Sequence, residues 1–477
     1  MKTTLILPSV GKVKGQKYIK SWQMYPLNLA VLAGLTPKDV EVRFLDDRLD
    51  EIPYDETTDL VAMSTETYNA QRTYNIASEF RSRGVPVVLG GIQASLDTLE
   101  VSEHADAVVV GDAEPVWDQL IRDAKNGKLQ KIYRAQSRKG TLQHVQPRRD
   151  LFKGKKYLPV GLVETGRGCP FTCDFCAIAG SYEGSYRTKA IDDIVADIES
   201  TNQRNLYFVD DNFISRFSRT RDLCDAIAPL GKKWMSQGSI NMADNPELLK
   251  GLEKSGCVNI LIGFESLNPE TLKTMGKTWN VAKRDYGQAI QRLRDHGVSI
   301  YGTFVFGYDS DTKDDFKRTV DFAIEHKLAL AAFNHLIPFP GTPLYKRLKE
   351  EGRLHHDKWW LEPGYRFGEV AFDPKNMSPE ELAENCFDAR REFYSYGSVF
   401  HRMQDMKANL KDFSNAAYFF WVNLFSGKEV ARRQGWPIGS VIESSELYDK
   451  RPNGNGFYTN SQKRDDISKL SLPVIRE

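Results

Sequence analysis

The sequence predicts an α/β protein made of two consecutive parallel-sheet units and a mainly helical C-terminal region. Short apolar runs alternate with amphipathic stretches in the first part of the chain and again from residue 157, the pattern of parallel strands joined by helices. From about residue 350 the pattern becomes helical and rich in aromatic residues. We therefore predict a Rossmann-like, doubly wound domain (1–127), a linker (128–156), a partial (β/α)6 TIM-type barrel (157–349), a helical domain (350–437) and a polar tail (438–477).

The composition excludes several classes of protein. A net charge of +1 with 27% charged and 41% hydrophobic residues argues against a nucleic-acid-binding or disordered chain. The N-terminal apolar stretch is too short for a signal peptide, and no apolar run approaches the ~20 residues of a membrane span. Six cysteines without a regular framework argue against a secreted disulfide scaffold, so we expect a reducing cytoplasm.

The N-terminal domain is predicted from five short apolar runs. They are strands at 4–7, 40–45, 60–64, 85–89 and 107–110, with helices at 26–35, 68–83 and 115–126. Ligands of such sheets bind at the carboxyl ends of the strands, where glycine lets the backbone approach closely. The candidate ligand contacts at these ends are Ser64, Thr65, Glu66, Gly90, Gly91, Gln93, Gly111 and Glu114.

The segment 128–156 is polar and is predicted to cross the surface as a linker, with its charges solvated; its arginines are Arg134, Arg138, Arg148 and Arg149. A second strand–helix alternation follows. After the apolar run 160–163, further strands are predicted at 206–209, 234–238, 259–263, 299–306 and 331–336. Six strands, each followed by a helix-length segment, predict a partial barrel whose catalytic groups collect at the carboxyl ends of the strands.

A loop after the first of these strands carries Cys169, Cys173 and Cys176 in the spacing C-x3-C-x2-C. Three thiolates gathered in this way favour an iron–sulfur cluster or zinc. A structural zinc site takes four ligands, and no second Cys/His pair follows. A [4Fe–4S] cluster with three protein ligands leaves one iron open. The spacing and its flanking glycine and aromatic residues resemble the radical S-adenosylmethionine (SAM) superfamily, in which the open iron binds the amino and carboxylate groups of SAM.

This resemblance implies SAM-binding residues at the later strand ends. Asp210 and Asp211 would accept hydrogen bonds from the amino group, and Glu265 would serve the ribose hydroxyls or the amino group. Arg187 would pair with the carboxylate through its two-pronged guanidinium. The remaining candidates are Ser239, Asn241 and, on the strand expected to pack on adenine, Phe304. For each of them the alternative is helix capping or a buried salt bridge.

The N-terminal domain resembles the cobalamin-binding domain that precedes the core in the B12-dependent branch of that superfamily. The matching segments are 25–33, 87–91 and 106–114. Gln93 stands where many relatives have histidine, and the D-x-H-x-x-G signature for a lower axial histidine is absent, because Asp47, Arg48 and Leu49 occupy that stretch. We expect cobalamin to bind without a protein histidine on its lower face. The alternative is a domain that is empty or only structural.

The C-terminal region carries dense aromatic residues and the apolar block 416–425, which is too short to span a bilayer. Basic residues flank that block, so a helix on a membrane surface, the wall of an apolar substrate pocket and a helix packed at the barrel mouth are all open. We expect the aromatic helices to cover the barrel mouth, because a radical reaction requires the exclusion of water.

The resemblance implies an enzyme that cleaves SAM reductively to a 5′-deoxyadenosyl radical and methylates an unactivated carbon, although no catalytic residue is assigned. Radical cyclisation, rearrangement or carbon–carbon coupling without methyl transfer is the alternative. A zinc-containing, non-enzymatic binding protein is the alternative of another class. The expected partners are a small-molecule or lipid-like substrate and an external electron donor such as flavodoxin or ferredoxin. We expect no nucleic acid, and contact with a membrane surface stays open.

Overall fold

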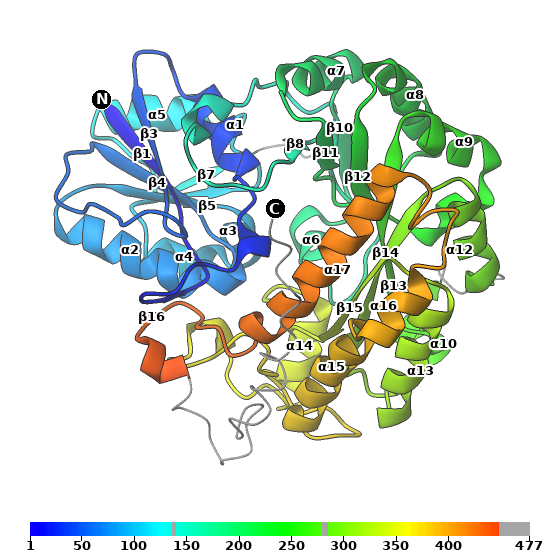
Figure 1. Cartoon of the computed structure of the whole chain (residues 1–477). Helices are drawn as coiled ribbons and strands as arrows, with labels where there is room; N and C mark the ends of the chain where they lie inside the picture. The colour runs from blue at the N-terminus through cyan, green and yellow to red at the C-terminus, as the bar shows by residue number, and fades with distance from the viewer. Residues whose placement is uncertain (136–139, 279–284, 448–477) are drawn as a thin grey trace.

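The computed structural model describes residues 1–135, 140–278 and 285–447, and it places two parallel sheets side by side (Figure 1). The N-terminal sheet has the strand order β3-β1-β4-β5-β6-β7. Its strands are β1 (Lys2–Leu7), β3 (Glu41–Asp46), β4 (Leu60–Ser64), β5 (Val87–Gly90), β6 (Ala107–Val110) and β7 (Ile132–Arg134), and all of the pairings are parallel. The five predicted strands are confirmed to within three residues at each end.

Alternating side chains bury both faces of this sheet, as expected for parallel strands between helices. On β4, Val61 and Met63 join one core, and Leu60 and Ala62 join the other. The helices are α1 (Leu27–Leu35), α2 (Ala70–Ser82), α3 (Ile92–Leu96), α4 (Thr98–Glu103) and α5 (Trp117–Lys125). The three predicted helices are confirmed, whereas α3 and α4 were not expected.

The segment predicted as a solvated linker is part of the fold, and that prediction is wrong. Its strand β7 extends the sheet beside β6. Leu142, Val145 and Phe152 are buried, so the segment also contributes apolar contacts. Arg149 donates to Asp197 (2.6 Å) at a half-buried position, although Arg148 pairs with Asp150 at the surface as expected. Arg138 lies outside the described residues.

The second sheet contains the six predicted barrel strands in sequential order, with β8 and β15 at its edges. They are β8 (Gly161–Val163), β11 (Asn205–Phe208), β12 (Lys233–Gly238), β13 (Cys257–Glu265), β14 (Ser299–Phe306) and β15 (Leu330–His335). All neighbours are parallel, which confirms the open six-stranded barrel sheet. The helices are α7 (Ile191–Ser200), α8 (Phe217–Ile227), α9 (Pro246–Lys254), α10 (Pro269–Thr274), α12 (Tyr286–Asp295), α13 (Lys313–Glu325) and α14 (Pro343–Glu350).

Several short elements complete the chain. The antiparallel pair β9 (Gly166–Gly168) and β10 (Tyr186–Thr188), together with α6 (Ala177–Tyr182), encloses the cysteine loop. Strand β2 (Lys12–Val13) pairs with β16 (Val441–Ile442), so the predicted tail begins with an ordered strand. The 3-10 helices are η1 (Lys20–Trp22), η2 (Thr67–Asn69), η3 (Arg149–Phe152), η4 (Ala228–Leu230), η5 (Ile240–Asp244), η6 (Trp359–Leu361) and η7 (Ser444–Leu447).

The C-terminal helices are α15 (Pro379–Phe393), α16 (Tyr396–Arg402) and α17 (Phe413–Arg433), and α17 runs diagonally past the barrel toward the N-terminal domain (Figure 1). Helix α15 packs beside the edge strand β15, where Phe393 lies 5.7 Å from Phe333 between ring centroids. Trp359 and Trp360 do not cover the barrel; they are buried in the core of the N-terminal domain. Phe413 (89% exposed) points to solvent. The expectation that aromatic residues cover the barrel mouth is therefore wrong for these three side chains.

Within the described ranges, no helix is long and apolar enough to cross a membrane.

Candidate functional site

The three clustered cysteines lie on one loop at the carboxyl end of β8. Cys169 follows β9 directly, and Cys176 is the residue before α6. All three are free thiols, and burial raises the pKa of each, that of Cys173 to about 12. Metal binding therefore has to displace thiol protons, as it does in other thiolate sites.

The donor set fits a polynuclear cluster better than a single ion. The three thiols are close enough to act on one another electrostatically, and Asn212 Nδ2 lies 3.8 Å from Cys169 Sγ. No three His, Cys, Asp or Glu side chains of the described chain gather as ligands of one metal ion. In a [4Fe–4S] cluster each thiolate binds a different iron, so the sulfurs stand further apart than around zinc.

The acidic pair after β11 is divided between two roles. Asp210 is buried and accepts hydrogen bonds from the Thr165 backbone N–H (2.7 Å) and hydroxyl, which fixes the turn after β8. Asp211 accepts from the Gly168 N–H (2.7 Å) and lines a pocket. Burial raises the pKa of Asp210 to about 7 and that of Asp211 to about 6. Of the two carboxylates, only Asp211 lines this pocket.

Glu265 stands at an irregular end of β13. Its φ is +63°, and the register with β14 shifts between Gly263 and Glu265, which marks a β-bulge. The carboxylate accepts from Lys277 Nζ (2.8 Å), and the Lys277 ammonium also lowers the pKa of the Cys173 thiol against the larger effect of burial. The bulge therefore directs Glu265 toward the cysteine loop.

Ser239 and Asn241 follow β12 and interact with each other, since the Ser239 hydroxyl donates to Asn241 Oδ1 (2.6 Å). Ser239 is buried and Asn241 is half-buried. Their assignment to SAM stays a prediction.

Two further SAM candidates have protein partners in the structure, and their assignment to SAM stays a prediction. The Arg187 guanidinium is buried and donates to Asp112, so it joins the two domains, while its buried Nε has no hydrogen-bond partner. Phe304 is fully buried and stacks between Phe264 and Phe333, with ring centroids 5.6 and 5.5 Å away. Along β14 the residues that keep accessible surface are Tyr301, Thr303 and Val305, as the two-residue period of a strand requires.

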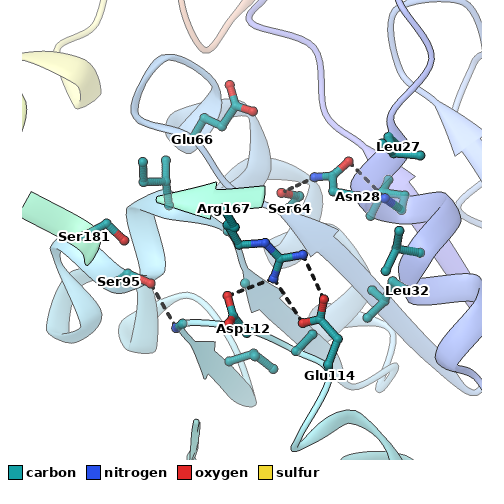
Figure 2. Close-up of a pocket in the computed structure, with 18 of the residues that line it drawn as sticks. Leu27, Asn28, Leu32, Ser64, Glu66, Ser95, Asp112, Glu114, Arg167 and Ser181 are labelled. Carbon is teal, nitrogen blue, oxygen red and sulfur yellow. Dashed lines mark hydrogen bonds and ion pairs between the residues drawn. The ribbon is translucent and has the colours of Figure 1, made fainter. Parts of the chain in front are cut away.

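A pocket of ≈ 640 Å³ lies between the two domains (Figure 2). Six of the eight predicted ligand contacts line it, namely Ser64, Glu66, Gly90, Gly91, Gly111 and Glu114. The barrel contributes Asp211, Arg167 and residues of α6 to the same pocket. The strand ends of one sheet and the helix that follows the cysteine loop, α6, therefore share one space, of a size typical for ligand sites.

Arg167 closes one side of the pocket with a buried ion-pair network (Figure 2). Its guanidinium donates to Asp112 (2.9 Å), Glu114 (2.8 Å) and Glu164 (2.8 Å). Burial alone would raise the pKa of Glu164, but the charges of Arg167 and Lys189 lower it to about 2. Glu114 is thus engaged in joining the domains as well as lining the pocket.

The other two predicted contacts of the N-terminal domain, Thr65 and Gln93, are fully buried and do not line this pocket. The Gln93 amide accepts from the Thr67 hydroxyl (2.8 Å) and donates to Glu100 (3.1 Å). At Gly91 (φ +95°) a Cβ would lie 2.6 Å from the Thr65 carbonyl oxygen, so strand packing, rather than a ligand, requires this glycine.

The sequence did not single out the apolar wall of the pocket. Helix α1 supplies Leu27, Asn28, Val31 and Leu32, and Asn28 Nδ2 donates to Ser64 Oγ (2.9 Å; Figure 2). The segment 25–33 carried a family resemblance. Apart from Asn28, its helical residues are apolar all round the helix, so the sequence pattern does not show which of them face the pocket and which face the core. A flat cofactor with apolar faces and amide edges fits this combination of a leucine-rich helix, glycine turns and hydroxyl groups.

Two family models match the chain. The first, described as the radical SAM superfamily, matches residues 163–323 and includes the three cysteines. The second, described as a domain of unknown function (DUF4070), matches residues 342–431, the C-terminal helical region.

Relatives match the chain over most of its length. Bacteriochlorophyllide d C-12(1)-methyltransferase of Chlorobaculum tepidum is 33% identical over 415 residues, which cover 84% of this chain and 89% of the relative. Hopanoid C-2 methylase of Rhodopseudomonas palustris is 29% identical over 350 residues (70% and 66%). The methyltransferase TsrM from Kitasatospora setae, solved with cobalamin and a [4Fe–4S] cluster, shares the fold with a TM-score of 0.59 at 18% identity over 82% of this chain and 81% of that chain. The chain therefore belongs to the radical SAM superfamily, in the family of the bacteriochlorophyllide d C-12(1)-methyltransferase.

Proposed function

We propose that this protein is a cobalamin-dependent radical SAM methyltransferase that adds a methyl group to an unactivated carbon. When bound, a reduced [4Fe–4S] cluster supplies the electron that cleaves SAM, and cobalamin carries the methyl group. An external donor such as flavodoxin or ferredoxin supplies that electron to the cluster. The observation that carries the proposal is a pocket that is lined both by α6, the helix after the cysteine loop, and by the N-terminal strand ends.

The chain's own residues orient the cofactors and exclude water. Cys169, Cys173 and Cys176 would hold the cluster, with Lys277 and Asn212 beside them. Asp211 and Glu265 would accept the SAM amino and hydroxyl groups. The wall of α1 with Ser64, Gly90 and Gly111 would hold the cobalamin.

The substrate is proposed to be a large, mostly apolar ring system. The relatives named above act on bacteriochlorophyllides and hopanoids, according to their names. The aromatic side chains that α15 and α17 contribute beside the barrel sheet favour such a body over a small polar metabolite.

The test is anaerobic reconstitution with iron, sulfide, cobalamin and a reducing system, followed by turnover with SAM that carries a trideuterated methyl group. Transfer of the labelled methyl group to a chlorin or hopanoid acceptor, with release of 5′-deoxyadenosine, supports the proposal. Loss of SAM with no labelled acceptor would favour cyclisation or rearrangement.

Two matched triple variants separate the cluster from a zinc site. Replacing Cys169, Cys173 and Cys176 with alanine should remove iron, sulfide and SAM cleavage. Replacing Cys224, Cys257 and Cys386, which are buried in the barrel core, should leave the iron content, the sulfide content and SAM cleavage unchanged. Zinc without sulfide in the unaltered protein would overturn the assignment.

A further inference from the structure

Helix α17 carries large apolar side chains on the side that faces solvent. They are Phe413 (89% exposed), Phe420 (38%), Trp421 (47%) and Leu424 (42%). The buried side of the helix is mixed, and its residues are Asn415, Phe419, Val422, Asn423 and Glu429. A surface helix normally buries its apolar side and exposes its polar one. Among the described residues, seven of the ten exposed large apolar side chains lie between 396 and 424, so such surface is concentrated in this part of the chain.

The buried asparagines fix the rotation of α17 about its axis. Asn415 Nδ2 donates to the Ala408 carbonyl (2.9 Å), and Asn423 Nδ2 donates to the Ala329 carbonyl (3.0 Å). Asn423 Oδ1 accepts from the fully buried Arg402 (2.9 Å). Rotating the helix to bury its aromatic side would leave these groups without partners, which is unfavourable. The apolar side therefore stays outward in the folded chain.

The outward side chains form one continuous stripe. Phe413, Phe420 and Leu424 are spaced by seven and four residues, so they share one side of a helix with 3.6 residues per turn. Trp421 lies beside them, and its ring stacks on Phe425 with 5.2 Å between centroids and 9° between planes. The stripe extends over about 16 Å of helix. We call Phe413, Phe420, Trp421 and Leu424 the outer face of α17.

Two exposed lysines adjoin this face. Lys20 Nζ lies 6.0 Å from the centroid of the Phe425 ring, the same ring that stacks on Trp421. Lys428 follows Leu424 by four residues and therefore extends the stripe by one turn. Within the part of the chain that the structure describes, neither lysine forms an ion pair.

The acidic residues of the same region already have partners. Asp405 pairs with Arg294 (2.8 Å), and Asp412 lies 3.6 Å from Lys233. Glu429 is buried and pairs with Arg432 (2.8 Å). The charge that remains uncompensated beside the outer face is therefore positive.

Aromatic side chains flanked by unpaired lysines match an anionic lipid surface. Aromatic rings settle at the boundary between headgroups and acyl chains, and lysines bind the headgroup phosphates. The polar groups on the other side of α17 require the helix to lie in the plane of the membrane rather than to cross it. A second copy of this chain would complement the apolar side chains, but the acidic residues named above are paired and leave none for the lysines.

We propose that the outer face of α17 docks this protein on an anionic membrane surface, with Lys20 and Lys428 on the lipid phosphates. These residues lie outside the pocket between the domains, so docking does not depend on the reaction that the pocket performs. A large apolar substrate of the proposed kind dissolves in the same bilayer, and docking would bring the enzyme to it.

The test measures the binding of the full chain to vesicles by sedimentation. Vesicles of equal parts phosphatidylglycerol and phosphatidylcholine should bind at least about tenfold more tightly than phosphatidylcholine alone, and added salt should weaken that binding. Phe420→Gln with Trp421→Gln and Leu424→Gln should lower the affinity at least about tenfold. Lys20→Gln with Lys428→Gln should lower it about tenfold for the anionic vesicles only.

Insertion of the outer face has a direct spectroscopic readout. Lipids with brominated acyl chains should quench part of the tryptophan fluorescence of the unaltered protein. Trp421→Phe should remove the quenched part and leave the emission of the other tryptophans unchanged.

The controls remove matched side chains elsewhere on the surface. Leu99→Gln replaces a 78% exposed leucine on α4, and Lys38→Gln with Lys128→Gln removes the same charge from the N-terminal domain. Neither change should alter binding, and circular dichroism verifies that every variant is folded. Absence of binding to anionic vesicles, binding that survives the triple variant, or absence of bromine quenching would overturn the inference. A dimer that the triple variant dissociates, in a protein that binds no vesicles, would instead assign the outer face to contact between two copies.

Discussion

His335 ends the last barrel strand as a buried and uncharged side chain. Its Nδ1 lies 2.9 Å from the Leu336 carbonyl oxygen, which fixes Nδ1 as the protonated nitrogen because a carbonyl can only accept. Burial lowers the pKa of His335 from 6.5 to about 4, and the charge of Arg390 lowers it further. The folded protein therefore holds a neutral imidazole where the unfolded chain would take up a proton.

This difference predicts a loss of stability in acid. Above pH 6.5 both states are neutral, so the contribution is fully present there; it is lost as the pH falls toward the folded pKa of about 4. The full loss is roughly 3 kcal/mol, since one pKa unit equals about 1.4 kcal/mol. His335→Gln should reduce the drop in melting temperature between pH 7 and pH 5, measured by circular dichroism. The exposed His401→Gln is the control, and an unchanged drop in the His335 variant would contradict the argument.

At the level of residues, short-range patterns predicted the site better than long-range ones. The spacing of Cys169, Cys173 and Cys176 places three thiols on one loop whatever the rest of the fold does. The partner of Arg187 is Asp112 in another domain, which no local pattern reveals. For Phe304, strand periodicity fixes which residues share a face of β14, but it does not say which face turns toward a ligand.

Among the elements, the end of β13 shows how a strand positions a functional group. Its bulge turns Glu265 back over Gly263, toward Lys277. A Cβ at Gly263 would lie 2.2 Å from Glu265 Oε1 and 3.1 Å from Lys277 Nζ. The glycine therefore leaves room for this ion pair beside the cysteine loop.

Gly263→Ala should displace the Glu265 carboxylate and weaken SAM binding without unfolding the barrel. We expect about a tenfold increase in the dissociation constant for SAM, equivalent to about 1.4 kcal/mol, by equilibrium dialysis of the reconstituted protein. Gly397→Ala is the control, because a Cβ there meets no atom within 4 Å. Unchanged SAM affinity in the Gly263 variant would show that Glu265 acts only structurally.

The sequence predicted the long elements and missed the short ones for a physical reason. Strands β4, β6 and β14 carry apolar runs that a buried parallel strand requires, and their bounds agree with prediction. Strand β7 has only one buried residue in three, and β9 is Gly-Arg-Gly, so neither contains the pattern of a strand. Their pairing depends on partners elsewhere in the chain.

For the whole molecule, the C-terminal region is a structural part of both other domains. Trp360 Nε1 donates to Glu100 (3.1 Å), and Trp359 packs in the same N-terminal core. Trp436 Nε1 donates to the Gly11 carbonyl (2.8 Å), beside the β2–β16 pair. The order of domains along the sequence suggested independent units, but the C-terminal region packs against the first residues of the chain.

Truncation before residue 350 should therefore unfold the protein rather than produce an open barrel. It removes α15 from the edge strand β15 and both tryptophans from the N-terminal core, where loss of one buried tryptophan costs about 3–5 kcal/mol. Such losses together exceed the usual stability of a domain. We expect an aggregated product without cluster absorbance, and rapid digestion by trypsin. A chain ending at Leu447 retains every contact described above and should bind cofactors normally. If the shorter chain instead stayed folded, with intact cluster absorbance and SAM cleavage, the C-terminal helices would be a dispensable cover, and the buried tryptophans would contribute far less than their packing implies.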